Sequence, residues 1–263
     1  MGQTVSADGD AAPPPLPATT SVGARMMNVF ATPGDVFAEV KVSKPNSANW
    51  LLPALLLTLV GWLSAWLIFS QESVRRQLSD LGDKAIQKQV EARKLTREQA
   101  EQARAMTERF AGIGVKIGAV IAPVFQGFGA PFWWALILWL VGTKALKGDF
   151  TYLCAAEVAG LANMIMILAS IVKTLLIVTF GNLYAGASLV LLMPDFDGSD
   201  PLQGFLAKLD LLTFWSLIVY AVGLAKLSNH SLGKAAAWVF GLWLGFNGLI
   251  LGAALGIKRL TGY

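Results

Sequence analysis

The sequence predicts an all-α, polytopic transmembrane bundle of about five spans with a charged helical hairpin outside the membrane. Of its 263 residues, 55% are apolar and only 14% are charged. The apolar residues gather in long stretches with few charges, and one stretch rich in both acids and bases separates the first two. Such stretches are stable as helices surrounded by hydrocarbon, so a water-soluble core is the poorer interpretation.

Five stretches are long enough to cross a bilayer, which needs about 20 apolar residues at about 1.5 Å per residue. The expected spans are 50–69, 117–143, 156–178, 211–227 and 235–257. The second is longer than required and contains Pro123 and Pro131, so a kink or a re-entrant start is expected there. Residues 152–193 are almost continuously apolar; we prefer one span followed by a half-buried segment over 184–193, and six spans stay open.

The remaining segments have a different composition. Residues 1–25 are small, polar and proline-rich and predict a disordered tail ahead of a membrane domain over 26–263. Between 26 and 40, apolar residues on either side of Pro33 predict short amphipathic helices at the membrane interface. Residues 71–112 predict the charged hairpin, with a capping box starting its second arm at Thr96. That hairpin is either a docking arm or a solvated structure that packs on itself.

The chain has few residues suited to catalysis or metal binding. Cys154 is the only cysteine and His230 the only histidine, and they lie in different predicted segments. No nucleophile has a base at a plausible spacing, so no enzymatic activity, cofactor or metal site is predicted. The formal charge of +4 comes from bases interleaved with acids, which argues against nucleic acid as a partner.

Glycines recur at helical spacing along the last span. Missing side chains along one stripe let another helix approach closely, which is how helices associate in lipid. The expected helix-packing residues are Gly241, Gly245, Gly248, Gly252 and Gly256.

Four polar residues lie at or near membrane depth, where a charge at the centre of a span costs about 2.5 to 3.5 kcal/mol. They are Glu157, Asn163, Lys173 and Asn247. Interhelical bonding or an interface position is the preferred interpretation, and an ion or substrate path is the alternative.

Three pieces in a fixed order resemble the Yip domain family, most closely its bacterial branch. They are residues 28–37 leading into 49–53, the charged insert 95–102, and 200–201 through 209–224. The resemblance implies five membrane helices and a cytosolic N-terminal side. In eukaryotes it also implies a part in vesicle traffic and a small GTPase partner. The short tail and the large first loop depart from eukaryotic members, so a GTPase partner is expected only if the source is eukaryotic.

The charges of the short loops also favour a cytoplasmic N-terminus. The expected location is the inner membrane of a bacterium or an endomembrane of a eukaryote. The preferred function is a non-enzymatic, membrane-organising scaffold whose partners are the lipid bilayer and either a second copy or another membrane protein. The alternative is a small-solute transporter or channel, favoured by the broken second span and the polar residues of the third and fifth.

Overall fold

Every regular element in the described part of the chain is helical. The structure is a computed structural model that describes residues 20–193, 196 and 200–261, apart from the side chains of 107–112, 191–192 and 261. The α-helices are α1 (Val22–Asn28), α2 (Pro33–Val42), α3 (Ala48–Ser70), α4 (Glu72–Glu91), α5 (Arg97–Val124), α6 (Ala130–Leu140), α7 (Tyr152–Phe180), α8 (Pro201–Leu206), α9 (Leu211–Ser228) and α10 (Leu232–Thr261). Two π-helical segments, η1 (Phe125–Gly129) and η2 (Val141–Ala145), and a 3₁₀ turn, η3 (Leu189–Leu192), complete the set.

Five apolar helices confirm the predicted fold class. The helices long and apolar enough to cross a membrane are Ala48–Ser70, Ile113–Ala145, Tyr152–Phe180, Leu211–Ser228 and Leu232–Leu260. Each contains one predicted span and extends it by a few residues at one or both ends. Within the described residues, the segment after α7 holds only the four-residue η3, so it adds no sixth span.

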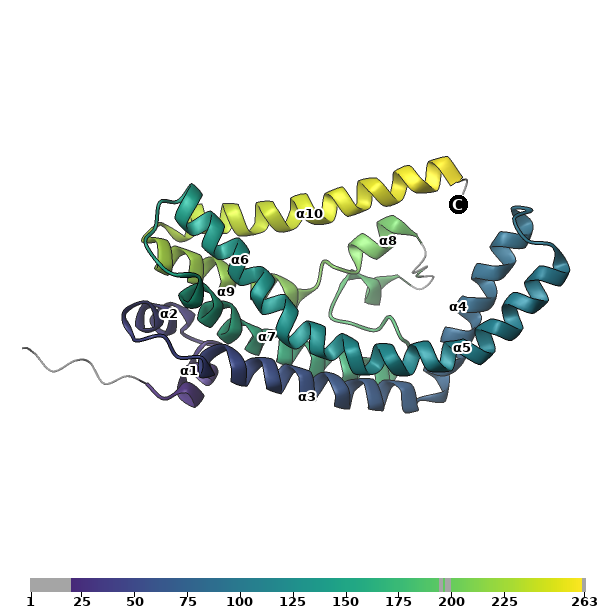
Figure 1. Cartoon of the computed structure of the whole chain (residues 1–263), viewed down its shortest axis with the longest axis horizontal. Helices are drawn as coiled ribbons and strands as arrows, with labels where there is room; N and C mark the ends of the chain where they lie inside the picture. The colour runs from purple at the N-terminus through teal and green to yellow at the C-terminus, as the bar shows by residue number, and fades with distance from the viewer. Residues whose placement is uncertain (1–19, 194–195, 197–199, 262–263) are drawn as a thin grey trace, which may run out of the picture.

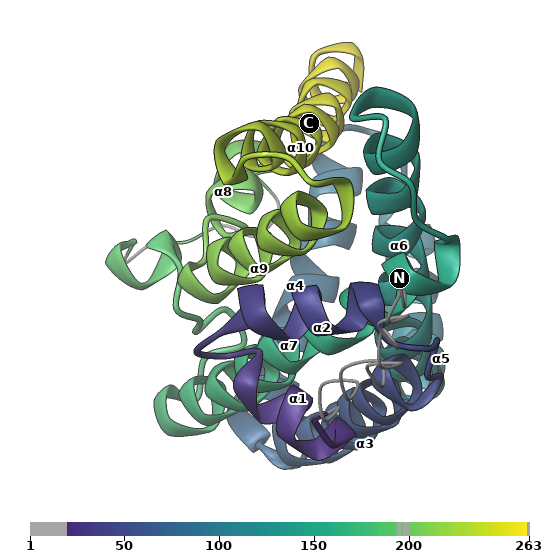
Figure 2. The ribbon, with the colours of Figure 1, turned by 90° about the vertical axis from the view of Figure 1, so that its left-hand side faces the viewer.

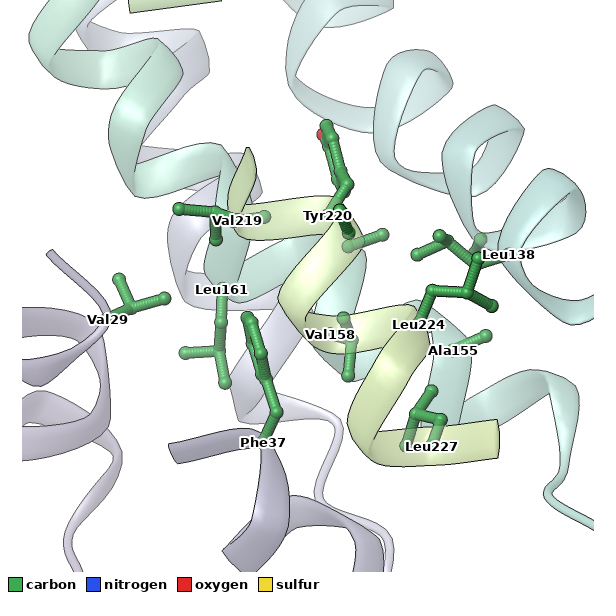
Figure 3. Close-up of a cluster of buried hydrophobic side chains, with 14 of the residues drawn as sticks. Val29, Phe37, Leu138, Ala155, Val158, Leu161, Val219, Tyr220, Leu224 and Leu227 are labelled. Atoms are coloured by element: carbon green, nitrogen blue, oxygen red, sulfur yellow. The ribbon is translucent and has the colours of Figure 1, made fainter. Parts of the chain in front are cut away.

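Helix α7 is the centre of the bundle and packs against α3, α6 and α9. Its first half is rich in alanine, and Ala155, Ala159 and Ala162 are fully buried. The small side chains bring the neighbouring helices close, and larger ones such as Leu161 and Leu224 fill the space between them (Figure 3). Seen from the end that carries α1 and α2, α3 and α10 lie at opposite edges of the bundle (Figure 2).

The N-terminal helices correct two predictions. Residues 1–19 of the predicted tail lie outside the described residues, but its last part is helical, because α1 begins at Val22 with the Ser21 hydroxyl capping it. Two helices do flank Pro33, as predicted, yet their apolar face does not turn to the membrane interface. Phe37 is fully buried and packs beside Gly223 of α9, where a Cβ would lie 2.3 Å from the Val158 Cγ1 of α7 and 3.4 Å from the Phe37 ring.

An ion pair joins α1 to α2. Arg25 is buried, and its guanidinium donates to Glu39 at 2.9 Å. Thr20 donates to the same carboxylate from its backbone N–H at 2.6 Å and also from its hydroxyl. Burial acts to raise the pKa of Glu39, but the hydrogen bonds from Thr20 and Arg25 outweigh it and hold that pKa below its ordinary value.

The charged hairpin is present, but its second arm continues into the membrane domain. The predicted capping box forms: the Gln99 N–H donates to the Thr96 hydroxyl, and the Gln99 side chain accepts from the Thr96 N–H. From there α5 runs unbroken past residue 112 into the second span (Figure 1). Ile86 is buried where α4 and α5 pack together. The two arms therefore pack on each other, with no separate helix start at the membrane.

The second span is continuous and has no re-entrant start where a kink or a re-entrant start was expected. The irregularity takes the form of η1, whose wider turn accommodates the missing N–H of Pro131 without a re-entrant loop. Gly127 in η1 lies directly against α3, because a Cβ built there would be 2.2 Å from the Thr58 hydroxyl and 2.6 Å from the Ala54 carbonyl oxygen. The second and first spans can approach this closely only with glycine at position 127.

Helices α7 and α9 are of unequal length, which shapes the segment between them. Helix α7 has 29 residues and α9 only 18. The connecting chain, described over 181–193, 196 and 200–210 and called the returning segment below, therefore folds back along the bundle before α9 starts, and α8 lies in the space beside α10 (Figure 1). Two backbone contacts fix the return: Ser188 pairs with Asp210 in an isolated bridge, and the Leu211 N–H donates to the Ala187 carbonyl at 3.2 Å.

Candidate functional site

A buried carboxylate ties the beginning of α3 to α7. Glu157 is only 2% exposed. One of its oxygens accepts from the Asn49 side-chain amide at 2.5 Å, and the other accepts from the Asn46 backbone N–H at 3.0 Å. Sequence reasoning placed Glu157 near the end of its span, where the side chain could reach the headgroups. The structure instead buries it, because α7 begins four residues earlier than predicted and α2 and α3 cover its first turns.

Gly160 lies one turn further along α7 and was missed by sequence reasoning. A Cβ at this position would be 2.3 Å from the Trp50 Cα and 2.9 Å from the Asn49 carbonyl oxygen. The backbones of α3 and α7 therefore meet here, which sets the distance at which Asn49 reaches Glu157. The available signal was the spacing of Ala156 and Gly160, a small-xxx-small pair.

A second polar contact joins α7 to α9. Asn163 and Tyr220 are 1% and 2% exposed, and the tyrosine hydroxyl donates to the Asn163 side-chain oxygen at 3.4 Å. The ring of Trp134 from α6 stacks on Tyr220, with centroids 4.5 Å apart. Three spans thus meet at this polar contact, while the Asn163 side-chain nitrogen has no hydrogen-bond partner among the described residues.

The fifth span carries a third polar contact. Lys208, which follows α8, donates to the buried Asn247 side-chain oxygen at 2.9 Å, and the Asn247 nitrogen donates to the Trp243 carbonyl. Lys258 and Asp200 form an ion pair at 2.9 Å further along α10. Hydrogen bonds from Lys258 and from the backbone at α8 lower the pKa of Asp200. These contacts hold the returning segment against α10.

Lys173 has a different setting from the other predicted polar residues. It is exposed to a cavity of about 820 Å³ bounded by α3, α5, α7 and the returning segment. It forms no ion pair with any described residue. The structure therefore places the four predicted polar residues at four separate positions and does not assemble them into one path.

The five glycines of α10 face away from the bundle. A Cβ built at any of Gly241, Gly245, Gly248, Gly252 and Gly256 would meet no atom within 4 Å. Ala235 and Val239 are the buried residues near the start of α10, and the glycine stripe begins two positions later, about 200° around the helix. Only 6% of the apolar window of α10 is buried, against 56% for α9. No helix in the described chain packs on this stripe.

Comparison with known proteins identifies the family. The Yip1 domain model matches residues 27–255, which include most of the chain. The chain belongs to the Yip1 domain family. Neither the curated proteins nor the solved structures give a significant match.

The Yip1 domain match confirms the resemblance, and its position in a bacterial branch stays a prediction. The match begins in α1 and ends in α10, so the hairpin, all five spans and the returning segment belong to the Yip1 domain. Within the described residues of this Yip1 protein, no three His, Cys, Asp or Glu side chains are grouped so that they could hold a metal ion. Family membership and five apolar helices together make it an integral membrane protein.

Proposed function

We propose that this Yip1 protein is a non-enzymatic membrane scaffold that self-associates through the glycine stripe of α10. The observation that carries the proposal is the open stripe: five glycines at helical spacing on a span of which the rest of the chain buries only 6% of the apolar window. Glycines on other spans, such as Gly127 and Gly160, are already used to bring helices together within the chain.

A second copy of α10 is the partner that fits this stripe best. A stripe of glycines spaced by four and three residues is complementary to itself, because each backbone ridge can lie along the other's groove. Leu244 and Leu249 flank it and are 50% and 76% exposed, so they would gain packing against the partner helix. The charged hairpin lies at the end of the molecule remote from α1 and α2 (Figure 1). In such a dimer the hairpins of the two copies would together form a surface available to other proteins.

The test is association in membranes of full-length protein carrying Gly248→Leu. Because Gly248 has open space around its Cα, leucine there fits within one copy and disturbs only a neighbour. We expect crosslinked dimer to fall about fivefold, which corresponds to about 1 kcal/mol. Gly114→Leu is the matched control, since Gly114 is equally open but lies on α5. Equal crosslinking of both variants and the wild type would reject α10 as the interface.

We also propose that the end carrying α1 and α2 faces the cytoplasm. The lysines of the short loops support this orientation: Lys41, Lys44, Lys144, Lys147, Lys226 and Lys234. One of them, Lys41, donates to the Asn229 side chain at 2.7 Å and to the Lys226 carbonyl at 3.1 Å, which links α2 to the end of α9. In a Cys154→Ser background, a membrane-impermeant thiol reagent applied from outside should label a cysteine placed at Arg259 and spare one placed at Lys44. The reverse pattern would invert the orientation.

A small-solute transporter is the second candidate, and the cavity beside Lys173 is the observation that favours it. Asn247 does not line that cavity, so it is a poor test of this candidate. A better one is Gly118→Leu, which adds bulk at a cavity-lining position where a Cβ meets no atom within 4 Å. Solute flux into reconstituted vesicles that is lost in Gly118→Leu and kept in Gly114→Leu would favour transport over the scaffold.

A further inference from the structure

The cavity between α3, α5, α7 and the returning segment has a mixed wall. Its volume of about 820 Å³ lies within the range of about 300 to 1,000 Å³ typical of small-molecule sites. It exists because the residues that line it from α3 and α5 are mostly small. These are Gly61, Ser64, Ala65, Gly118, Ala119 and Ala122.

Among the described residues, the cavity wall contains one cation and one carboxylate. Lys173 comes from α7, and Asp210 comes from the end of the returning segment. They form no ion pair with each other or with other described residues, so the separation between their charged groups exceeds 4 Å. One Asp210 oxygen accepts from the Leu212 and Thr213 N–H groups, and the second oxygen forms no hydrogen bond with any described residue. A lysine and a carboxylate oxygen are both available to a ligand.

Hydroxyl groups extend this polar wall. The Ser170 and Ser64 hydroxyls lie 3.4 Å apart at the cavity edge. The Thr174 hydroxyl, on the next turn of α7, donates to the Ser170 carbonyl at 2.7 Å and can therefore only accept from a ligand. A hydroxyl can donate to a phosphate oxygen as well as accept from an ammonium group. Such groups favour a ligand that carries both charges over a purely apolar one.

An apolar groove of about 500 Å³ lies beside the cavity. The two hollows share Ala65 and Phe69 of α3 and Val115 and Ala119 of α5. Trp62 and Trp66 line the groove, and both are exposed; Ser70 and the exposed Lys116 are its polar lining residues. An apolar groove flanked by tryptophans next to a charged cavity has the dimensions and polarity of an acyl chain beside its headgroup.

The depth of Lys173 in the bundle agrees with a headgroup. It lies seven residues before the end of α7, about 10 Å at 1.5 Å per residue, and Asp210 caps the start of α9. The backbone of Lys173 is equally far from the middle of α7 at Met166, so its long side chain must extend along the helix to reach the phosphate layer, whereas Asp210 lies at the end of its span.

We propose that this cavity binds a zwitterionic phospholipid of the ethanolamine type. Its phosphate lies at Lys173, its ammonium group donates to the free oxygen of Asp210, and an acyl chain occupies the groove beside Trp62 and Trp66. A choline headgroup fits less well, because its quaternary ammonium has no N–H to donate to Asp210. A glycerol headgroup fits less well because it leaves the Asp210 charge beside an anion.

The experiment measures lipid retained by the detergent-purified full chain in native mass spectrometry, after it is supplied with dioleoyl lipids that differ only in headgroup. We expect the ethanolamine lipid to be retained at least fivefold over the choline and glycerol lipids. Lys173→Gln and Asp210→Asn should each lower retention about fivefold; asparagine keeps the cap on α9 and removes only the charge. Lys234→Gln, an exposed lysine at the other end, is the control.

Gly118→Leu gives a second, steric test that does not depend on charge. Gly118 and Gly114 are both open positions on α5, but only Gly118 lines the cavity. Retention should fall about tenfold in Gly118→Leu and stay unchanged in Gly114→Leu. Three results would each overturn the proposal. They are equal lipid retention by Gly118→Leu and Gly114→Leu, equal retention of all three headgroups, and displacement of the lipid by millimolar phosphoethanolamine. The last result would identify a soluble solute as the ligand and would strengthen the transporter candidate.

Discussion

Replacing Glu157 with leucine should destabilise the bundle, and the structure gives the size of the effect. The substitution leaves the fully buried Asn49 amide nitrogen without an acceptor, which costs about 1 to 3 kcal/mol. The Asn46 N–H also loses its acceptor, but Asn46 is exposed and water can replace the bond, so the further loss is about 0.5 to 1 kcal/mol. Together these give a loss of about 1.5 to 4 kcal/mol in the free energy of unfolding.

Glu157→Gln should cost less than about 1 kcal/mol. The glutamine oxygen keeps one bond, and its nitrogen can donate to the Asn49 oxygen, which has no partner in the structure, after that amide turns over. Unfolding by dodecyl sulfate in mixed micelles, followed by tryptophan fluorescence, measures both values. The exposed Glu101 on the hairpin, changed to leucine, is the control and should leave the free energy unchanged.

Two results would refute this reasoning. If Glu157→Leu were as stable as the wild type, the carboxylate would not be holding α3 to α7. If Glu157→Gln were as damaging as Glu157→Leu, the charge rather than the hydrogen bonds would matter, and Glu157 would return as a candidate member of an ion path.

Three further predictions concern other contacts. Gly160→Leu should cost at least about 3 kcal/mol, because its side chain overlaps the Trp50 backbone; a variant that unfolds at the wild-type detergent concentration would contradict the close approach. Asn247→Leu removes the acceptor of Lys208 and should speed proteolysis between residues 193 and 210 severalfold in micelles, with no change expected if the returning segment holds without it. The pKa of Glu39 is lowered on folding, so its contribution to stability is present above its ordinary value of 4.5 and is lost as the pH falls through the lower folded value. The thermal unfolding temperature of Glu39→Gln should therefore depend less on pH than that of the wild type between about pH 5 and 3, the window in which this carboxylate is protonated.

The spans were predictable because they depend on local composition alone. A stretch such as 50–69 has no charge and no competing fold in water, so its class follows from the free energy of transfer to hydrocarbon. The capping box at Thr96 was equally local, since both partners lie within four residues.

The contacts between distant segments were not predictable in the same way. Phe37 looked like a membrane-facing residue because its destination, the gap beside Gly223, lies 186 positions away and becomes visible only when α2 packs on α9. Gly160 escaped notice for the same reason: small residues are frequent in spans, and only the position of Trp50 shows which one is indispensable. The cavity is bounded by four segments that are distant in the sequence. From the sequence alone, Lys173 was therefore only a polar residue in an apolar stretch.

The unequal lengths of α7 and α9 also bear on the lipid around the protein. Twenty-nine residues reach about 43 Å as a helix and eighteen reach about 27 Å, on either side of a hydrocarbon layer of roughly 30 Å. The bilayer beside α9 must thin or α7 must tilt, and each ångström of mismatch costs a fraction of a kcal/mol. Lipid near this chain is therefore stressed unevenly around its perimeter, and several copies gathered side by side would add their local deformations into one patch of distorted membrane.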